Sequence, residues 1–516
     1  MKKKLLIIIP SAILLVFAII FTTFVIYYRV ETFSVDFAET EYSLDENGYL
    51  TDIPYEDYFH GMETPAGVDI RTFGAAPTKS AAENTTAIQN AINALDGGET
   101  LIVAGGRYSI GTINLKSNMT LFIERDSALV SCTNDEKRLL NDALIKSAGA
   151  TNIKITGEGI IDGNTDSFFD KAKADEWLMP LKNFNLRNLV LEQRKRIRFP
   201  KKNSGRVHLV KLFNCQNVEV DGIELKDSGQ FTLYIMNSKS AHIENVIIND
   251  RVGTANADGI DIDGTSDVVI RNCFVVAADD AVCMKAELNK VDNVLIEDCK
   301  VMSLANSFKI GTATNFDVTN ITVRNCYFFV AGTIGGYAGI SIQSADGATV
   351  ENILVENIEM QNVNSAFLIW LGSRSAKTQG VGSVKNITLR NICANNINLP
   401  SAITGCKYKG AEYKPTDIEI IDCYFIYRDS GERLIGRNID VQSGLGGYPE
   451  ITRVSHMYVG NHSLSIYFDL PVYGLFARYG GNLKIENFTV IPRANTKLQM
   501  SNINIYSPQS RGGSRE

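Results

Sequence analysis

The chain has 516 residues, of which 45% are hydrophobic and 21% are charged, and its formal net charge is −7. This is the composition of a folded protein and excludes a disordered or collagen-like chain. Because four of the cations lie in residues 1–29, the remainder is more acidic still, which argues against nucleic acid as a partner.

The first 29 residues predict a single membrane-spanning helix. Three lysines, Lys2 to Lys4, precede an apolar run from Leu5 to Tyr28, and Arg29 follows. The run can cross a bilayer and ends without a small-x-small cleavage site, which favours an uncleaved anchor over a signal peptide. The lysines place the N-terminus in the cytoplasm. We therefore expect a single-pass protein of the cell membrane with an extracellular catalytic domain; secretion after signal cleavage is the alternative.

Residues 30–66 are strongly acidic. Ten aspartates and glutamates lie between Glu31 and Glu63, without a lysine or arginine. A segment of one charge sign is typical of a solvated, extended linker. We expect an acidic spacer here, followed by one domain over residues 67–516.

That domain carries an internal repeat. Asparagine or aspartate followed by alternating apolar residues recurs at positions 267, 293, 320, 352 and 386, at intervals of 26, 27, 32 and 34 residues. A repeat of this length made of short β-branched strands is one coil of a parallel β-helix, whose core closes only by stacking. The sequence predicts an all-β, single-stranded, right-handed parallel β-helix with asparagine stacked on asparagine.

Two segments depart from the repeat. Thr85 to Leu95 has Ile88, Ile92 and Leu95 at helical spacing, which predicts a helix that caps the N-terminal end. An insertion of about residues 165–207 contains Trp177 and a basic run that ends at Arg206. It is either a loop that guards a groove and attracts an acidic polymer or a solvated helical excursion.

The nine cysteines show no paired framework. Cys273, Cys299, Cys326 and Cys423 each follow an asparagine or aspartate in the repeated phrase, which predicts stacked, buried thiols rather than disulfides. No Cys-x-x-Cys or Cys/His cluster indicates a metal site, and we expect no cofactor.

Aligned coils place acidic residues together. Asp258 and Asp280 occupy equivalent positions at the mouths of neighbouring strands, about 4.8 Å apart, and Asp279 precedes Asp280. Repulsion among three carboxylates must raise the pKa of at least one, so that a protonated acid lies beside an ionised base, as glycosidic hydrolysis requires. Lys285 and Lys309 are near enough to restrain this charge or to bind substrate.

These residues resemble a known family. Asn256-Ala-Asp258 and Ala278-Asp279-Asp280 are similar to the Asn-Thr-Asp and Gly-Asp-Asp motifs of glycoside hydrolase family 28, the polygalacturonase family of the pectate-lyase-like superfamily. The resemblance runs from Val68 to about residue 375. It implies an inverting hydrolase of a pectin-related or other plant-type polysaccharide or oligosaccharide, in which Asp279 protonates the leaving group while Asp258 and Asp280 position and deprotonate water.

Two family motifs are altered, which makes the chain a divergent member. Ala305-Asn306-Ser307 replaces Gly-His-Gly, and Ser341-Ile-Gln343 replaces the Arg-Ile-Lys that binds galacturonate. Asn306 can partly replace the histidine as a polar positioner. Neutral Ser341 and Gln343 suit a neutral or differently substituted sugar.

Two further residues join Asn256, Lys285, Asn306, Lys309, Ser341 and Gln343 as substrate-binding candidates. Trp370 faces outward on the same side, either as an exposed platform for sugar stacking or packed against a loop. His208 lies where the family carries substrate-proximal residues, and belongs either to the site or to the surface.

Two other functions fit the fold. A polysaccharide lyase would need calcium-binding acids and an arginine or lysine base, and no arginine base is evident. A non-catalytic carbohydrate-binding β-helix is consistent with the two altered motifs.

Overall fold

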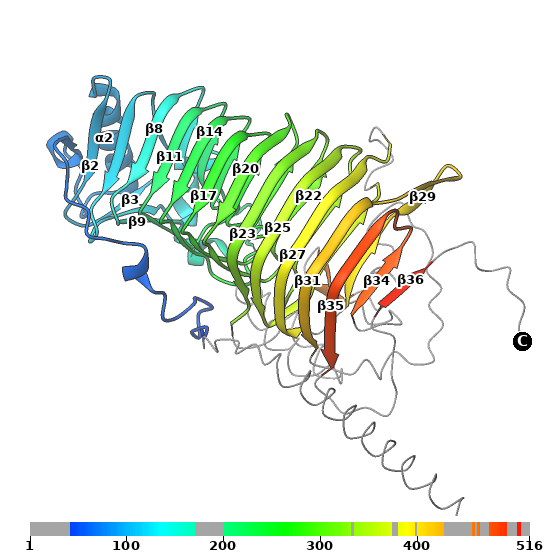
Figure 1. The fold of residues 1–516 in the computed structure, drawn as a ribbon. Helices are drawn as coiled ribbons and strands as arrows, with labels where there is room; N and C mark the ends of the chain where they lie inside the picture. The colour runs from blue at the N-terminus through cyan, green and yellow to red at the C-terminus, as the bar shows by residue number, and fades with distance from the viewer. Residues whose placement is uncertain are drawn as a thin grey trace, which may run out of the picture. The chain divides into compact units, whose positions relative to one another are not determined.

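The computed structural model describes residues 42–170, 200–331, 335–373, 380–397, 400–427, 457–459, 462–464, 474–492 and 503–506. They belong to one compact unit that starts at Tyr42. Strands of successive coils pair in parallel along this unit, as Figure 1 shows. The predicted parallel β-helix is confirmed.

One strand of each coil contributes to a twelve-stranded sheet, which carries most of the predicted site residues. Its strands are β4 (Ile113–Asn114), β7 (Ala143–Ala148), β10 (His208–Phe213), β13 (Leu233–Met236), β16 (Ile260–Asp263), β19 (Val282–Ala286), β22 (Asn306–Thr314), β24 (Gly335–Ser344), β26 (Val363–Leu371), β28 (Ser401–Thr404), β34 (Leu475–Arg478) and β36 (Ile503–Tyr506).

The other strands form a twenty-stranded sheet. They are β1 (Val68–Asp69), β2 (Glu99–Val103), β3 (Arg107–Ile110), β5 (Met119–Ile123), β6 (Ala128–Ser131), β8 (Thr151–Thr156), β9 (Ile160–Asp162), β11 (Gln216–Asp221), β12 (Glu224–Lys226), β14 (Lys239–Glu244), β15 (Ile247–Asn249), β17 (Ser266–Arg271), β18 (Phe274–Ala277), β20 (Val291–Glu297), β21 (Lys300–Ser303), β23 (Val318–Phe329), β25 (Thr349–Gln361), β27 (Ser383–Ile397), β31 (Thr416–Tyr427) and β35 (Leu483–Pro492). From β23 onward one long strand spans what two strands cover in earlier coils, since β23 pairs with both β20 and β21.

The repeated asparagines stand at positions where the chain needs a left-handed backbone. Asn320, Asn352 and Asn386 have φ angles of 58°, 59° and 54°. Asparagine tolerates this conformation better than other side chains. The amide of Asn386 donates to Oδ1 of Asn352 at 2.7 Å, and Asn352 donates to Asn320 at 3.1 Å. The predicted stacking is confirmed, and it links each coil to the next.

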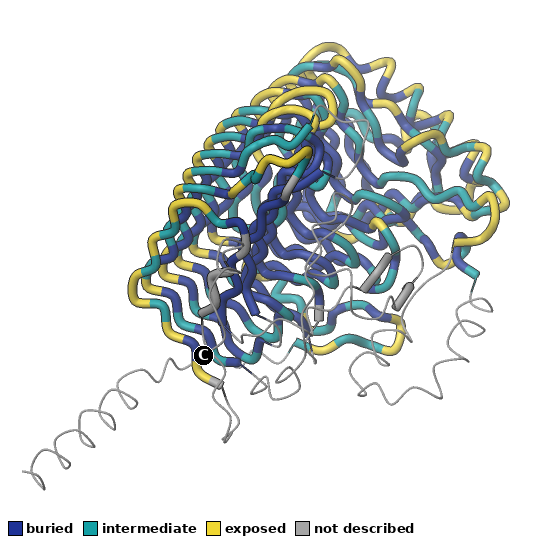
Figure 2. The backbone as a smooth tube through the Cα atoms, turned by 90° about the vertical axis from the view of Figure 1, so that its right-hand side faces the viewer, coloured by how far each residue is buried: buried dark blue, intermediate teal, exposed yellow. Residues whose placement is uncertain are grey.

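Apolar columns fill the interior between the sheets. In the twelve-stranded sheet Ile260 pairs with Leu233 on one side and Val282 on the other, and Phe308 and Ile340 continue the column. All are buried, and Figure 2 shows the buried interior beneath exposed turns. Burying each such side chain contributes about 1.5–3 kcal/mol. The nine cysteines are free thiols, and the predicted stack of Cys273, Cys299, Cys326 and Cys423 is buried.

The capping helix is α2, Ala81–Ala94. Ile88 and Ile92 are buried, as their spacing predicts. The helix begins earlier than expected because Ser80 and Glu83 form a capping box: the Ser80 hydroxyl accepts from the Glu83 amide at 3.3 Å, and the Ser80 amide donates to Glu83 Oε2 at 3.0 Å.

The described part of the acidic segment, residues 42–66, is not a solvated spacer, so the expected domain start at residue 67 is wrong. Tyr42 stacks on Phe329 with ring centroids 4.7 Å apart, and Tyr58 packs edge-on against Phe274 at 5.8 Å. Charge counting overlooked the aromatic residues between the acids, whose burial favours packing against the coils. The short helix η1 (Tyr55–Asp57) lies in this segment.

Other expectations fall on residues that the structure does not describe. Within the described ranges, no helix is long and apolar enough to cross a membrane; the expected anchor, residues 1–29, lies outside them, as do residues 30–41. Residues 171–199 of the insertion also lie outside, while its ends meet where Phe169 bridges Pro200. The remaining short elements are η2 (Ile70–Phe73), η3 (Asn134–Leu139), η4 (Thr165–Phe168) and the hairpins β29 (Cys406–Tyr408) with β30 (Ala411–Tyr413) and β32 (Met457–Val459) with β33 (His462–Leu464).

Candidate active site

The predicted acids lie at the start of neighbouring strands of the twelve-stranded sheet. Asp258 precedes β16 by two residues, and Asp280 precedes β19 by two. The parallel hydrogen bonds of the sheet extend to these residues, although the strands begin after them. The Gly259 amide donates to the Asp280 carbonyl at 2.9 Å, and the Thr232 amide donates to the Asp258 carbonyl at 2.8 Å. Asp258 and Asp280 are therefore direct neighbours along the stack.

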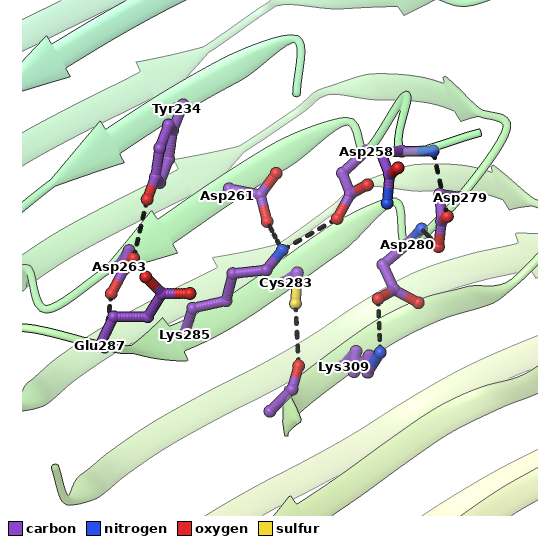
Figure 3. Close-up of polar contacts among 12 residues, drawn as sticks. Tyr234, Asp258, Asp261, Asp263, Asp279, Asp280, Cys283, Lys285, Glu287 and Lys309 are labelled. Carbon is purple, nitrogen blue, oxygen red and sulfur yellow. Dashed lines mark hydrogen bonds and ion pairs between the residues drawn. The ribbon is translucent and has the colours of Figure 1, made fainter. Parts of the chain in front are cut away.

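Asp279 joins them through an irregular backbone. The amides of Ala278 and Asp279 both donate to the Ala257 carbonyl, each at 3.1 Å, which interrupts the strand alternation before β19. One oxygen from each of Asp258, Asp279 and Asp280 then lies within 4.8 Å of those of the other two (Figure 3). We call these residues the acidic trio. The structure brings all three expected carboxylates together.

Two lysines and an asparagine hold the two buried members. Lys285 Nζ donates to Asp258 Oδ2 at 2.9 Å and also to Asp261 Oδ1. Lys309 Nζ donates to Asp280 Oδ2 at 2.6 Å, and Asn306 Nδ2 donates to Asp280 Oδ1 at 2.7 Å. The expected restraint of the trio by both lysines is present, and Asn306 does position an acid. All three side chains bind carboxylates of the protein, so their expected role in holding substrate directly stays a prediction.

The electrostatics follow from burial and crowding. Burial raises the pKa of Asp258 well above its ordinary range; Lys285 opposes this rise, while Asp261 and the rest of the trio add to it. Burial lowers the pKa of Lys285, but Asp258 and Asp261 outweigh it and raise that pKa well above its usual value. The ammonium form of Lys285 is therefore favoured, and the surplus of carboxylates favours a shared proton. A raised carboxyl pKa is found at Asp258, but burial is its largest cause, and the repulsion from which it was predicted only adds to it.

Asp261 is a member of this network that sequence reasoning did not select. Its side chain is completely buried, and burial raises its pKa to about 7 although Lys285 opposes the rise. It pairs with Cys283, which pairs with Lys309 in the next coil. The signal was available, because Asp261 lies in the outward column beside that of Lys285.

His208 belongs to the surroundings of the site rather than to a remote surface. Its ring centroid lies 5.0 Å from that of Phe231 and 5.1 Å from that of Tyr234, and Lys285 Nζ lies 4.2 Å from the Phe231 ring. Burial lowers the pKa of His208 to about 4, so the imidazole is neutral at neutral pH. Tyr234 in turn donates to Asp263 Oδ2 at 2.9 Å.

Three substrate-binding candidates are buried. Ser341 and Gln343 have 0% and 1% of their surface exposed, and Gln343 Nε2 donates to Ser341 Oγ at 2.6 Å, so they do not offer free hydrogen bonds to a sugar as expected. Trp370 is 2% exposed, and a Cβ at Gly372 would lie 2.5 Å from its indole. The prediction of an exposed Trp370 that stacks on a sugar is wrong, and the alternative of a packed Trp370 is confirmed, because its ring lies against Gly372.

Asn256 contributes through its backbone. Its side chain is exposed, its φ of 58° is left-handed, and its amide donates to Asp279 Oδ2 at 3.2 Å. The Asp280 amide donates to the other oxygen, Oδ1, at 3.0 Å. Both oxygens of Asp279 therefore accept from backbone amides.

Comparison with known proteins agrees with this arrangement. Residues 98–420 match the model of Glycosyl hydrolases family 28. An exopolygalacturonase of Cochliobolus carbonum is 21% identical over 332 residues, which are 60% of this chain and 62% of that protein. The chain thus spans less than two thirds of that relative. An exopolygalacturonase of Zea mays is 24% identical over 65% of this chain and 78% of its own.

Solved structures show the same fold. A family 28 exopolygalacturonase of Yersinia enterocolitica has a TM-score of 0.59 at 17% identity and covers 86% of this chain and 78% of its own. A hyperthermoactive exopolygalacturonase of Thermotoga maritima has a TM-score of 0.55 at 20% identity, with 72% and 90% covered. The family model spans more than half of the chain and includes the whole acidic trio, so the chain belongs to glycosyl hydrolases family 28.

Proposed function

We propose that this domain hydrolyses glycosidic bonds of a pectin-related or other plant-type polysaccharide or oligosaccharide, with inversion at the anomeric carbon. The observation that carries the proposal is the acidic trio: three carboxylates within 4.8 Å, at the positions of the family motifs, with two of them fixed by lysines. In this scheme Asp279 is the acid, and Asp258 and Asp280 bind the water.

The division of labour follows the burial of the three acids. Asp279 is the least buried of them, which favours it as the member that gives its proton to the leaving oxygen. Asp258 and Asp280 are buried and held by Lys285 and Lys309, so a water between them would have both hydrogens directed at carboxylates. The water oxygen attacks the anomeric carbon while its proton passes to this pair. The lysines offset the charge that then develops.

The short separation within the trio makes the product anomer the decisive measurement. Inverting glycosidases usually separate their two carboxyl groups by about 6.5–9.5 Å and retaining ones by about 5–5.5 Å. Here the base consists of two residues. Because the two O–H bonds of water diverge by about 105°, a water that donates a hydrogen bond of about 2.7 Å to each of two carboxylates needs only about 4.3 Å between their oxygens. The trio can therefore hold water without a wide gap.

The lysines also bear on the substrate and on the lyase alternative. Lys285 is bound between Asp258 and Asp261, and Lys309 is bound to Asp280, so both ammonium groups already have a carboxylate. This supports a sugar beside the trio whose carboxylate is esterified or absent. A lyase would need a neutral base, whereas the pKa of Lys285 is raised well above its usual value by Asp258 and Asp261 despite burial.

We further propose that the domain faces the outside of the cell. The support is the sequence of residues 1–29, with Lys2 to Lys4 before an apolar run of membrane-spanning length. Protease digestion of intact cells, with antibody detection of the domain, tests this placement, and resistance of the domain to the protease would reject it.

The test of the proposed hydrolysis uses the full chain and a panel of polygalacturonate, methyl-esterified pectin, rhamnogalacturonan and hemicellulosic oligosaccharides. Release of reducing ends, abolished in Asp279→Asn, supports hydrolysis, and proton NMR gives the anomer formed first. A retained anomer rejects inversion. Ultraviolet-absorbing unsaturated products indicate a lyase, and glycan binding without any product indicates a binding protein. Release of single sugars would show the exo action named for several relatives.

A further inference from the structure

Arg206, the last basic residue of the insertion, lies beside the loop that carries Asn256. Its Nε donates to the Gly229 carbonyl at 2.8 Å, and its Nη2 donates to the Ala255 carbonyl. Burial lowers the pKa of Arg206, and within the described ranges no ion pair joins it to a carboxylate. A guanidinium is costly to bury without an anion. The described contacts of the guanidinium are instead with the two backbone carbonyls.

The two ends of one peptide group connect Arg206 to the acidic trio. The carbonyl that accepts from Arg206 belongs to Ala255, and the N–H of the same peptide is that of Asn256, which donates to Asp279 Oδ2 at 3.2 Å. The positive guanidinium thus lies at the carbonyl end of the peptide dipole, which is negative. The negative carboxylate lies at the N–H end, which is positive. Hydrogen bonds in such a chain polarise and strengthen one another.

Arg206 is itself held firmly. Gln230 Nε2 donates to the Arg206 carbonyl at 3.0 Å, and the guanidinium carbon lies 5.5 Å from the ring of Phe169. A Cβ at Gly229 would lie 3.2 Å from Arg206 Cα, so the chain at residue 229 is close against it. The fork of a guanidinium can bind the carbonyls of residues 229 and 255 together, which the single ammonium of lysine does less well.

We propose that Arg206 is a positioning residue that orients the carboxyl group of Asp279 through the Ala255–Asn256 peptide. The inference rests on the proposed function, because it concerns the group assigned as the acid. Asn256 is left-handed at a φ of 58°, and the hydrogen bond from Arg206 holds the carbonyl end of the peptide that precedes it. A shift of about 1 Å in a reacting group can cost on the order of 100-fold in rate.

The pH dependence should change with Arg206. Within the described ranges, the charged groups near Asp279 include Asp258 and Asp280 of the trio. They also include Asp261 and the ammonium groups of Lys285 and Lys309, which pair with these acids. Arg206 acts on Asp279 through the Ala255–Asn256 peptide. Its loss weakens support for the ionised carboxylate, so the carboxyl keeps its proton to higher pH.

The test compares Arg206→Gln, Arg206→Lys and wild type in the full chain, with Arg271→Gln as a control that removes a partly exposed arginine bound to Glu297. On the best substrate of the panel, we expect Arg206→Gln to lower kcat on the order of 10- to 100-fold, with KM changed less than about threefold, and to move the alkaline limb of the kcat profile upward. Arg206→Lys should fall between, and Arg271→Gln should match wild type.

A second readout needs no substrate. In protein labelled with 13C at aspartate carboxyl carbons, the Asp279 signal is identified by its loss in Asp279→Asn, and its titration midpoint should move upward in Arg206→Gln. An unchanged midpoint and an unchanged kcat profile in folded Arg206→Gln would overturn the inference. If wild type cleaves nothing, the proposed function fails while the carboxyl titration still decides the role of Arg206. If Arg206→Gln does not fold, Arg206→Lys decides it by the same two readouts.

Discussion

Asn306 donates a 2.7 Å hydrogen bond to Asp280, and it stands in the segment that resembles the Gly-His-Gly motif of the family, at the place of the histidine. Both side chains are buried, and the other Asp280 oxygen accepts from Lys309 at 2.6 Å. One neutral donor and one cation therefore fix both oxygens of this carboxylate. The altered motif preserves the positioning of an acid, although it removes a titratable group.

The first prediction concerns that hydrogen bond. Asn306→Ala leaves a buried carboxylate oxygen without its donor, which should lower the free energy of unfolding by about 1–3 kcal/mol. Because Asp280 can then rotate, kcat should fall about tenfold or more. Chemical denaturation and initial rates measure both effects, with Asn315→Ala on an exposed turn as the control. Equal rates in Asn306→Ala and wild type would show that Asp280 does not depend on this contact.

A second prediction concerns Lys285. Lys285→Met removes the cation that Asp258 and Asp261 share, which should destabilise the fold by about 3–5 kcal/mol because buried charges lose their partner. Adding Asp261→Asn to Lys285→Met removes one of those charges and should restore part of the stability. Urea unfolding of wild type, both single variants and the double variant gives the coupling free energy between Lys285 and Asp261. Strict additivity would show that the two side chains act independently.

A third prediction distinguishes the acids. Asp258→Asn should lower kcat by about 100-fold or more, because the water loses one of its two carboxylate partners. The same substitution removes the carboxyl whose pKa burial raises, so it should leave Lys285 with Asp261 alone and preserve the fold. Initial rates and thermal melting test the two parts. The control is Asp292→Asn, at a half-buried aspartate of another sheet that is bound to Lys290.

The repeat allowed the coils and the neighbouring positions of Asp258 and Asp280 to be predicted, because strand alternation and the left-handed asparagines constrain every coil in the same way. Alternation shows which way a side chain leaves a strand, but not what packs over it, so the burial of Ser341 and Gln343 was missed. Asp261 was missed because Lys285 reaches it diagonally. The packing of residues 42–66 was missed because acidic composition hid the aromatic anchors such as Tyr58.

The fourth prediction tests the burial of Trp370. If the indole served as a sugar platform, its replacement would raise KM; as a packed side chain it should instead affect stability. Trp370→Ala should cost about 3–5 kcal/mol of unfolding free energy, while Trp370→Phe should keep KM within about twofold because no substrate contact is lost. Thermal melting and initial rates separate the two. A large rise in KM for Trp370→Phe without loss of stability would show instead that Trp370 contacts the sugar.

The last prediction concerns stability against pH. The pKa of Asp261 is raised to about 7 by burial, above its unfolded value of about 3.9, so the native state binds more protons between those values and Asp261 makes stability fall as pH rises through that window. Burial lowers the pKa of His208 to about 4, below its unfolded value of about 6.5, so His208 makes stability rise with pH up to about 6.5. The two slopes oppose each other at acidic pH. Urea midpoints of His208→Gln should therefore decline more steeply than wild type between pH 4.5 and 6.5, and those of Asp261→Asn should decline less, up to about pH 7. Parallel profiles for Asp261→Asn and wild type would show that Asp261 does not hold a proton in the folded protein.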